Sequence, residues 1–408
     1  MNRSFISLQG VASPFFSELC QELRQAGHKT HRINFCGGDL LLSLFEPHTN
    51  YSGTLGDLAV WLKHELEQHC ATDILLFGDC RAIHQVALAV AKELRIRAYV
   101  FEEGYLRPDW ITLERGGVNG YSSMCLEPAT VIGWADRHTE QSAPSHQTSG
   151  SSNLPARAFY DIAYRLANVA LSPLFKGYQT HRPRNGLLEY AGLARRFGMS
   201  AWFKREAQSV TARLLEEKVP YFLFPLQLNA DSQIKTHSPF PDVVASINAV
   251  LTSFAQSNVQ VENKPGHLVI KNHPLDTGLA HYRSFVERRA RELSLGERVK
   301  FIEAGDLSLL IAHARGVVLV NSTTGLTALS LNCPVYALGK AIFNRAMLTD
   351  QGVLAAFWQN PTPPEVGFVS LFIQYIKAHS QVNGNFYSHA GRKLAVSGSL
   401  QRLLKDVP

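Results

Sequence analysis

The segment FEEGYLRPDW (101–110) places two adjacent carboxylates, Glu102 and Glu103, directly after the apolar run RAYVF, with Arg107 close behind them. A carboxylate at a strand end can act as the base or nucleophile of a group transfer, and an arginine suits a carboxylate of the substrate. Successive strand residues point to opposite faces, so we expect one acid to enter a ligand cleft and the other to face solvent or an arginine. A salt-bridged loop without chemistry explains the same residues equally well.

Polar residues also follow apolar runs in the C-terminal half of the chain. Backbone N–H groups at a helix start, with hydroxyls and a glycine beside them, predict a site for phosphate, although a Ser/Thr helix cap is the simpler alternative. A histidine at a strand end could donate a proton to a leaving group. Together these residues favour nucleotide binding at one sheet edge; they are Lys271, Asn272, His273, Asn321, Ser322, Thr323, Thr324 and Gly325, with Gln227, Asp231, Gln233 and His237 in the loop after YFLFPLQL.

The N-terminal half offers a smaller set of polar strand ends, predicted to line the same cleft from the opposite wall: Gln9, Gly10, Asp79, Glu102 and Asn119. Ordinary strand-to-helix turns explain each of them singly. The sequence contains neither G-x-x-x-x-G-K-[ST] nor a G-x-G-x-x-G that opens a helix after a strand, which argues against P-loop hydrolysis and dinucleotide binding. Clusters of Asp and His with metal-ligand spacing are also absent. We therefore predict no cofactor and no metal.

The elements that must position these residues alternate between short apolar runs and amphipathic helices. Such alternation is typical of parallel sheets covered on both faces, and ligands of these sheets bind at the carboxyl ends of the strands. The expected fold is α/β, with two doubly wound Rossmann-like domains that face a cleft, as in GT-B glycosyltransferases. The predicted segments are a first domain at 1–155, a basic helical connection at 156–215, a second domain at 216–345, and helices at 346–408 that pack back on the cleft.

Composition narrows the class of protein. With 408 residues, 45% of them hydrophobic and 18% charged, the chain can bury large cores and is too apolar to be disordered. Its six cysteines show no C-x-x-C spacing, which suits a reducing compartment. The first residues lack the apolar core of a signal peptide, and no run of eighteen apolar residues occurs. We expect a cytoplasmic protein that neither is secreted nor spans a membrane.

Basic residues cluster between 165 and 205, where a single acid, Glu189, stands against eight cations interleaved with aromatic and leucine side chains. This mixture suits an anionic membrane surface. A solvated pair of interdomain helices is the alternative. A nucleic-acid binder would use the same cluster, but the chain has no recognised DNA- or RNA-binding module. The cations are Arg165, Lys176, Arg182, Arg184, Arg195, Arg196, Lys204 and Arg205.

Four ordered motifs, FEEGYLRPDWITLERGGVNGYSSM, PLQLNADSQI, IKNHPLDTG and VNSTTGLTAL, resemble the capsule polysaccharide biosynthesis and export family of Gram-negative bacteria, in particular its KpsS/LipB group. The resemblance runs from Gln9 to about Phe343. It implies a retaining glycosyltransferase that takes β-linked 3-deoxy-manno-octulosonate (Kdo) from CMP-Kdo. The implied acceptor is a phosphatidylglycerol-type lipid at the inner face of the inner membrane, and the implied partners are capsule assembly and export proteins.

The resemblance also implies residue roles. The family's E-D-G-F-L-R pattern aligns its second acid with Glu103, which makes Glu103 the expected nucleophile, although this chain has glutamate where the pattern has aspartate. Arg107 would hold the Kdo carboxylate. His273 and Lys271 would stabilise the departing phosphate, and Ser322, Thr323 and Thr324 would bind it. Asp231 and Gln233 are placed in the cleft.

Two other functions fit the same motifs. A non-catalytic export factor would dock the polymer or the transporter in this cleft without turnover, so that Glu103→Gln would be harmless. An inverting transferase for another CMP-linked keto-sugar acid would differ in the anomeric configuration of its product.

Overall fold

The computed structural model describes residues 2–138, 154–179, 186–228, 232–261 and 264–405. Contacts divide the chain into two compact units. Unit 1 comprises residues 1–124, 140–181 and 374–408, and unit 2 comprises 125–139 and 182–373. The last part of the chain therefore returns to the unit in which the chain begins. The four segments expected from the sequence are a different kind of division, and they stay a prediction.

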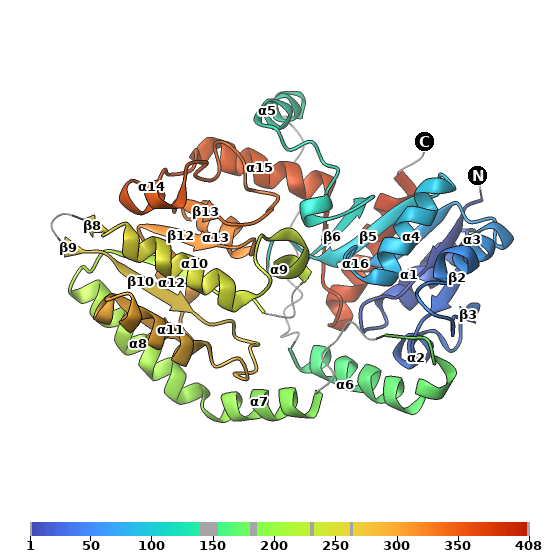
Figure 1. Cartoon of the computed structure of the whole chain (residues 1–408). Helices are drawn as coiled ribbons and strands as arrows, with labels where there is room; N and C mark the ends of the chain where they lie inside the picture. The colour runs from blue at the N-terminus through green and yellow to red at the C-terminus, as the bar shows by residue number, and fades with distance from the viewer. Residues whose placement is uncertain (1, 139–153, 180–185, 229–231, 262–263, 406–408) are drawn as a thin grey trace. The chain divides into compact units, whose positions relative to one another are not determined.

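Unit 1 is built on a sheet of seven strands among the described residues, in the order β14-β6-β5-β4-β1-β2-β3 (Figure 1). The pairs from β5 to β3 are parallel, whereas β6 is antiparallel to both β5 and β14. Its elements are β1 (Ser4–Ser7), α1 (Phe15–Gln25), β2 (Lys29–Asn34), α2 (Gly37–Ser43), β3 (His48–Asn50), α3 (Leu58–Gln68), β4 (Asp73–Phe77), α4 (Ala82–Glu93), β5 (Arg97–Glu103), β6 (Trp110–Arg115), α6 (Leu154–Ala170), β14 (Gln381–Asn383) and α16 (His389–Lys405).

The apolar strands of unit 1 bury both faces of the sheet. Phe5 and Phe101 pack on one face with residues of α1 and α16, and their strand neighbours Ile6 and Val100 pack on the other face with residues of α3 and α4. Each large apolar side chain buried in this way contributes about 1.5–3 kcal/mol to folding. Two-sided burial explains why these strands read as unbroken apolar runs in the sequence.

Unit 2 repeats the plan with a sheet of five parallel strands among the described residues, in the order β11-β10-β7-β12-β13. Its elements are α5 (Pro128–Arg137), α7 (Gly186–Gly198), α8 (Ser200–Glu216), β7 (Tyr221–Pro225), α9 (Ser232–His237), α10 (Val243–Gln256), β8 (Gln260–Val261), β9 (Lys264–Pro265), β10 (His267–Lys271), α11 (Tyr282–Glu292), β11 (Val299–Ile302), α12 (Leu307–Ala312), β12 (Gly316–Leu319), α13 (Thr324–Ser330), β13 (Val335–Ala337) and α14 (Leu354–Gln359). Helix α15 (Val366–His379) carries the chain from unit 2 to unit 1.

Both sheets have the Rossmann strand order, in which the chain starts at a central strand, adds two strands on one side and then crosses to the other. The order reverses between β1 and β4 in unit 1 and between β7 and β12 in unit 2. The predicted α/β fold with two Rossmann-like units is confirmed. That the units face one another across a cleft stays a prediction. In each unit the reversal point marks the place where ligands of such sheets bind.

Several elements of unit 1 were not expected from the sequence. Strand β6 is formed by the stretch WITLER, which was interpreted from the sequence as part of a polar motif. In the structure it contributes the buried side chains of Trp110 and Ile111 to the sheet. Strands β3 and β14 are only three residues long, too short for a clear period-two pattern. The short strand β14 pairs with β6, about 270 residues earlier in the chain, and local sequence patterns carry no signal for such a pairing.

Candidate functional site

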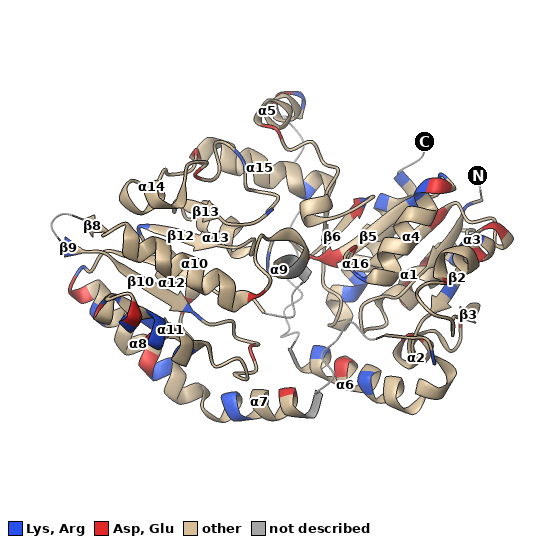
Figure 2. Ribbon diagram, viewed as in Figure 1, with Lys and Arg blue, Asp and Glu red and all other residues tan. Residues whose placement is uncertain are grey.

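Glu103 is the last residue of β5, at the carboxyl end of the sheet of unit 1, and its side chain is about three-quarters buried. Its carboxylate lies 3.5 Å from a guanidinium nitrogen of Arg157 on α6 and 3.9 Å from one of Arg107 in the β5–β6 turn. The hydroxyl of Tyr387 donates a hydrogen bond to Oε1 at 3.2 Å. The structure thus brings the predicted nucleophile next to the predicted arginine and adds a second arginine and a tyrosine. Figure 2 colours the acidic and basic residues along the ribbon.

Glu102 points to the opposite face of the sheet, as the strand alternation predicts. Its Oε1 accepts a hydrogen bond from the backbone N–H of Glu103 at 3.1 Å. Its Oε2 lies near Gly78, where an added Cβ would approach it to 3.3 Å. Gly104, which follows the two acids, packs so tightly on the next strand that a Cβ there would lie 2.2 Å from the carbonyl oxygen of Trp110. The E-E-G pattern is therefore required in part by the packing of the β5–β6 turn.

A second group of acids lies on the face of the unit 1 sheet to which Glu102 points. Asp79 is buried after β4, and its Oδ2 accepts a hydrogen bond from the backbone N–H of Val118 at 2.8 Å. Glu114 on β6 is buried and bonded to the hydroxyls of Tyr105, at 2.7 Å, and Ser122. Burial raises the pKa of Glu114 to about 7, with the two hydroxyls acting in the opposite direction. Asp79 was predicted from the sequence, whereas Glu114, whose raised pKa lets it hold a proton near neutral pH, was not.

Asn119 sits directly beside this acidic group. Its backbone N–H donates to the hydroxyl of Tyr105 at 2.7 Å, and its φ of 54° lies in the left-handed region that asparagine tolerates better than most residues. Its side-chain Nδ2 is buried and has no acceptor within the described part of the chain. Asn119 therefore presents an unused donor beside Tyr105 and Glu114.

Gln9 and Gly10 follow β1 and line or border a pocket of about 210 Å³ in unit 1. Gln9 is fully buried, donates to Asp39 at 3.1 Å and accepts from the guanidinium of Arg81 at 3.0 Å. Arg81 also donates to the carbonyl oxygen of Gly10 at 3.3 Å. The pocket walls combine Arg81 with aromatic and apolar side chains, including Tyr51 and Phe35. This pocket could hold a small ligand with one anionic group.

In unit 2, two amides meet at the point where the strand order reverses. Gln227 follows β7 and Asn321 follows β12; the Nε2 of Gln227 donates to the Oδ1 of Asn321 at 3.0 Å, and its Oε1 accepts from the backbone N–H of Asn321 at 3.1 Å. Asn321 also donates to the carbonyl oxygen of His237 at 3.3 Å. The predicted convergence of Asn321 with the loop after β7 is found, and Asn321 acts as a structural tie within it.

Lys271 ends β10 and is 92% buried. Its ammonium has one contact among the described residues, the carbonyl oxygen of Asn272 at 3.5 Å, and burial lowers its pKa. Asn272 and His273 form hydrogen bonds in and around the loop after β10. Asn272 donates to Glu303 at 2.7 Å, and His273 Nδ1 accepts from the backbone N–H of Leu275 at 3.1 Å. A buried ammonium without a carboxylate partner in the described chain is a ready site for an anion.

At the start of α13, after β12, side-chain hydroxyls interact with each other and with the backbone. Ser322 Oγ accepts from the backbone N–H of Thr324 at 3.2 Å and lies 3.1 Å from the hydroxyl of Thr324, while Thr323 is the residue preceding α13. A Cβ on Gly325 would lie 2.3 Å from the ring of Phe343, so this glycine is required by packing. Asp231 and the side chain of Gln233 lie outside the described residues, and their predicted places in the cleft stay predictions.

The basic segment is only partly a surface feature. Arg196 is buried, with a guanidinium nitrogen 2.6 Å from Glu303, and Arg165 pairs with Asp161 at 2.9 Å. Arg182 and Arg184 lie outside the described residues, which leaves Lys176, Arg195, Lys204 and Arg205 as exposed cations. Large apolar side chains are exposed in both units: Phe159, Ile162, Leu166 and Val169 on α6 of unit 1, and Leu188, Phe197 and Trp202 on α7 and α8 of unit 2. Among the described helices, none is long and apolar enough to cross a bilayer.

Arg157 and Tyr387 were missed because no local pattern marks them. Arg157 follows the polar stretch read as a linker, and Tyr387 lies 284 residues from Glu103 in the sequence. The signal for Glu114 was present in the motif ITLER, where an acid interrupts an apolar strand, but it was not separated from the other acids of that segment.

The described site can be set beside known proteins. The family model named capsule polysaccharide biosynthesis protein matches residues 72–387. The chain is 34% identical over 389 residues to the capsule polysaccharide export protein KpsS of Escherichia coli, covering 94% of this chain and 97% of that protein. It is 31% identical over 399 residues to the capsule polysaccharide modification protein LipB of Neisseria meningitidis serogroup B, covering 94% and 92%. A solved structure of the KpsC β-Kdo 2,7 transferase of Thermosulfurimonas dismutans matches with a TM-score of 0.46 at 12% identity, over 99% of both chains.

Proposed function

Since the chain belongs to the capsule polysaccharide biosynthesis protein family, we propose that it is a glycosyltransferase that moves Kdo from CMP-Kdo to a phosphatidylglycerol-type lipid with retention of configuration. The product would be the β-linked Kdo on which capsular polysaccharide is built for export. One observation carries the proposal: the three-quarters-buried carboxylate of Glu103, at the carboxyl end of β5, lies beside Arg107, Arg157 and Tyr387.

The chemistry follows from this carboxylate. Glu103 attacks the anomeric carbon of Kdo, a bond forms between its oxygen and that carbon, and the bond from the carbon to the CMP phosphate breaks. The acceptor hydroxyl then attacks the same carbon and gives its proton to solvent water, while the bond from that carbon to Glu103 breaks and frees the carboxylate. Two displacements, each with inversion, give overall retention. Tyr387, which donates to Oε1, orients the carboxylate and leaves Oε2 to react.

The two arginines give the site selectivity for an acidic sugar. Kdo carries a carboxylate on its anomeric carbon, and a guanidinium binds such a group through two parallel hydrogen bonds. The side chains of Arg107 and Arg157 are 55% and 44% exposed, so both can turn from Glu103 toward a substrate. A neutral sugar would leave them without this partner.

The buried ammonium of Lys271 supports phosphate binding in unit 2. Its desolvation is a cost to the folded protein that a bound phosphate would offset. The amide tie between Gln227 and Asn321 holds the neighbouring strand ends in place for this contact. In this proposal Lys271 stabilises the departing CMP, and His273 and the hydroxyls after β12 are further candidates for contacts to it.

The exposed apolar side chains support a lipid-borne acceptor. Phe159, Ile162, Leu166 and Val169 recur at helical spacing on α6, and each is at least 44% exposed. On unit 2, Trp202 lies exposed next to the exposed cations Lys204 and Arg205. Apolar and cationic side chains together bind an anionic bilayer surface, so we propose that the protein acts while docked on the inner membrane.

The test uses the purified full chain, CMP-Kdo and vesicles of phosphatidylglycerol or phosphatidylcholine. We expect a Kdo-lipid with the β configuration only with the anionic lipid, and a protein-bound sugar that can be trapped by acid quenching and located by mass spectrometry. Binding to vesicles should fall in Leu166→Ser and stay unchanged in Leu279→Ser, a matched exposed leucine elsewhere. Vesicle binding without any transfer would support the export-factor alternative, and an α-linked product would support inversion.

A further inference from the structure

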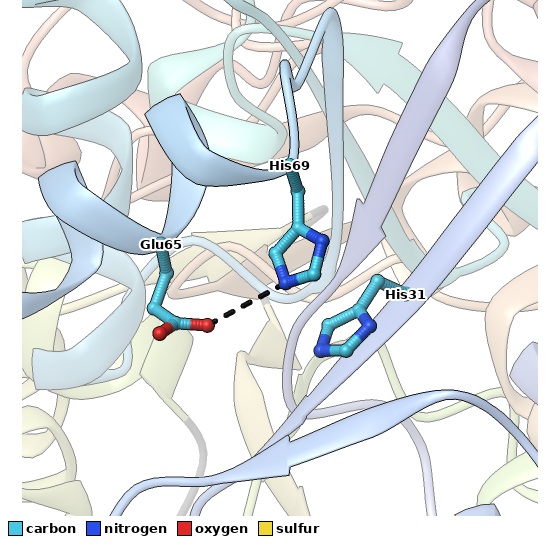
Figure 3. Close-up of side chains that lie close together, drawn as sticks. All are labelled: His31, Glu65 and His69. Carbon is cyan, nitrogen blue, oxygen red and sulfur yellow. Dashed lines mark ion pairs between the residues drawn. The ribbon is translucent and has the colours of Figure 1, made fainter.

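A group of three metal-ligating side chains lies in unit 1 away from Glu103 (Figure 3). His31 comes from β2, Glu65 from the last turn of α3, and His69 follows the end of that helix. One donor atom from each lies within 4.8 Å of the other two. The Nε2 of His69 is 3.7 Å from the Oε2 of Glu65, and the rings of His31 and His69 are stacked with centroids 3.9 Å apart.

The fold explains why these residues meet. Glu65 and His69 are four residues apart, so both lie on the same side of the helix at its end. In the β1–β2 ladder His31 is opposite Ile6, whose side chain packs in the core that α3 covers. His31 therefore points from the sheet toward α3. The sequence separates His31 from Glu65 by 34 positions, which is why no metal-binding motif is visible in it.

We propose that His31, Glu65 and His69 bind a divalent transition metal, with Zn²⁺ as the best match to two imidazoles and one carboxylate. Ligand bonds of about 2.0–2.2 Å in a tetrahedron place ligand atoms about 3.3–3.6 Å apart. The 3.7 Å between His69 and Glu65 is already near this value. His69 is 27% exposed and can rotate out of its stack on His31 to complete the set, leaving one position for water.

The surroundings of His31 favour this assignment. Its Nε2 lies 2.8 Å from the hydroxyl of Thr49 on β3, a contact that holds the ring in place beside Glu65 and His69. His48 is not part of the group, and its Nδ1 lies 2.8 Å from the carbonyl oxygen of Glu46.

The site lies at the opposite edge of the sheet from the proposed chemistry. The carbonyl oxygen of His69 accepts from the hydroxyl of Ser4, the first residue of β1, at 2.9 Å, whereas Glu103 is the last residue of the parallel strand β5. A metal here would tie β2 to α3 and stabilise unit 1 without touching the substrate. Chelation should then lower the melting temperature and leave the transfer rate at low temperature unchanged.

The experiment titrates untagged, metal-free full chain with Co²⁺, followed by its visible absorption, and with Zn²⁺, followed by thermal melting. We expect one equivalent of Co²⁺ with the intense d–d bands of a four-coordinate site. Zn²⁺ at about 100 times its Kd should raise Tm by about 5–10 °C. Glu65→Gln and His69→Ala should lose both signals, and Thr49→Val should bind about 10- to 100-fold more weakly. His64→Ala, an exposed histidine on the same helix, is the matched control.

Far-UV circular dichroism of each variant shows whether it is folded, and Thr49→Val tests the site even if a ligand variant does not fold. Equal Co²⁺ affinity in the wild type and in Glu65→Gln would overturn the proposal. A thiolate charge-transfer band that disappears in Cys70→Ser would also overturn it, because the metal would then be held by the cysteine that follows His69.

Discussion

The two sheets have the same strand order, but the side chains at the carboxyl ends of their strands differ in charge. In unit 1 this edge ends in acids, with Asp79 after β4 and Glu102 and Glu103 on β5. In unit 2 it ends in neutral amides and a buried lysine: Gln227, Asn321 and Lys271. Glu103 is surrounded by cations, whereas Lys271 has no anion near it within the described chain.

In the proposed function, this difference lets one scaffold serve two tasks. The Rossmann order determines where polar side chains gather, and the residue at each strand end determines what is bound there. A carboxylate balanced by arginines can form and release a covalent bond to an acidic sugar. A desolvated ammonium can hold a leaving phosphate. Variants of residues in each unit test the two halves of this contrast.

The largest effect is expected from Glu103→Gln. Loss of the nucleophile should lower kcat for Kdo transfer about 10⁴-fold and remove the trapped protein–sugar adduct. Glu102→Gln, its neighbour on the opposite face, is the matched control and should retain most activity. Glu103→Asp should keep measurable transfer, because aspartate occupies this place in the related pattern. If Glu102→Gln is the dead variant instead, the nucleophile has been assigned to the wrong face of the sheet.

The acidic character of unit 1 can be tested through Glu114. Because its folded-state pKa is raised to about 7, the folded protein binds this proton more tightly than the unfolded chain. Stability should therefore be highest below about pH 4.5 and fall as the pH rises to about 7, by about 3 kcal/mol from this group. Glu114→Gln should show a smaller fall across this window in urea unfolding. Parallel profiles for wild type and variant would mean that Glu114 titrates normally.

Lys271→Met tests the other half of the contrast with two readouts of opposite sign. Donor binding should weaken by about 2 kcal/mol, or roughly 30-fold in kcat/KM for CMP-Kdo. The free protein should become more stable by about 1 kcal/mol, because a buried charge has been replaced by an apolar chain of similar length. Calorimetry with CMP separates the two effects. A variant that loses stability would indicate a partner for Lys271 in the folded protein.

The smallest effects are expected from the two arginines. Arg107→Gln and Arg157→Gln should each raise KM for CMP-Kdo about 5-fold, or about 1 kcal/mol, since both side chains are partly exposed and either can compensate for the other. The double variant should lose more than the sum of the two. Comparison with a CMP-sugar that lacks the carboxylate sharpens the test, because that substrate should not respond to either change.

Sequence patterns predicted the elements that repeat and missed those that depend on distant pairing. The strands β1, β4, β5 and β10 are predicted from their apolar runs, because burial on both faces of a sheet requires apolar residues at successive positions. The position of Glu103 at a strand end followed directly from that reading, as did its proximity to Arg107. Arg157 could not be found in this way, because its approach depends on how α6 packs, which no local pattern records.

Burial itself was the other source of error. Arg196 was expected on a membrane-facing surface, since its neighbours are basic and aromatic, yet it is buried against Glu303. Sequence patterns predict that a charged residue in a basic run is exposed. The partner that allows Arg196 to be buried, Glu303, is 107 residues away in the sequence. For Lys271 the position at a strand end was predicted from the sequence. That no anion lies near it within the described chain became visible only in the structure.

The return of the C-terminal segment to unit 1 has a consequence for synthesis on the ribosome. The hydroxyl that binds Glu103 is translated 284 residues after it, which takes roughly 15 to 60 s at ordinary elongation rates. During that interval the later half can fold independently, while the face of α1 that α16 will cover stays open to solvent, with Phe15 and Leu19 on it. The nascent first half is therefore a natural client for chaperones, and the proposed site around Glu103 is assembled last.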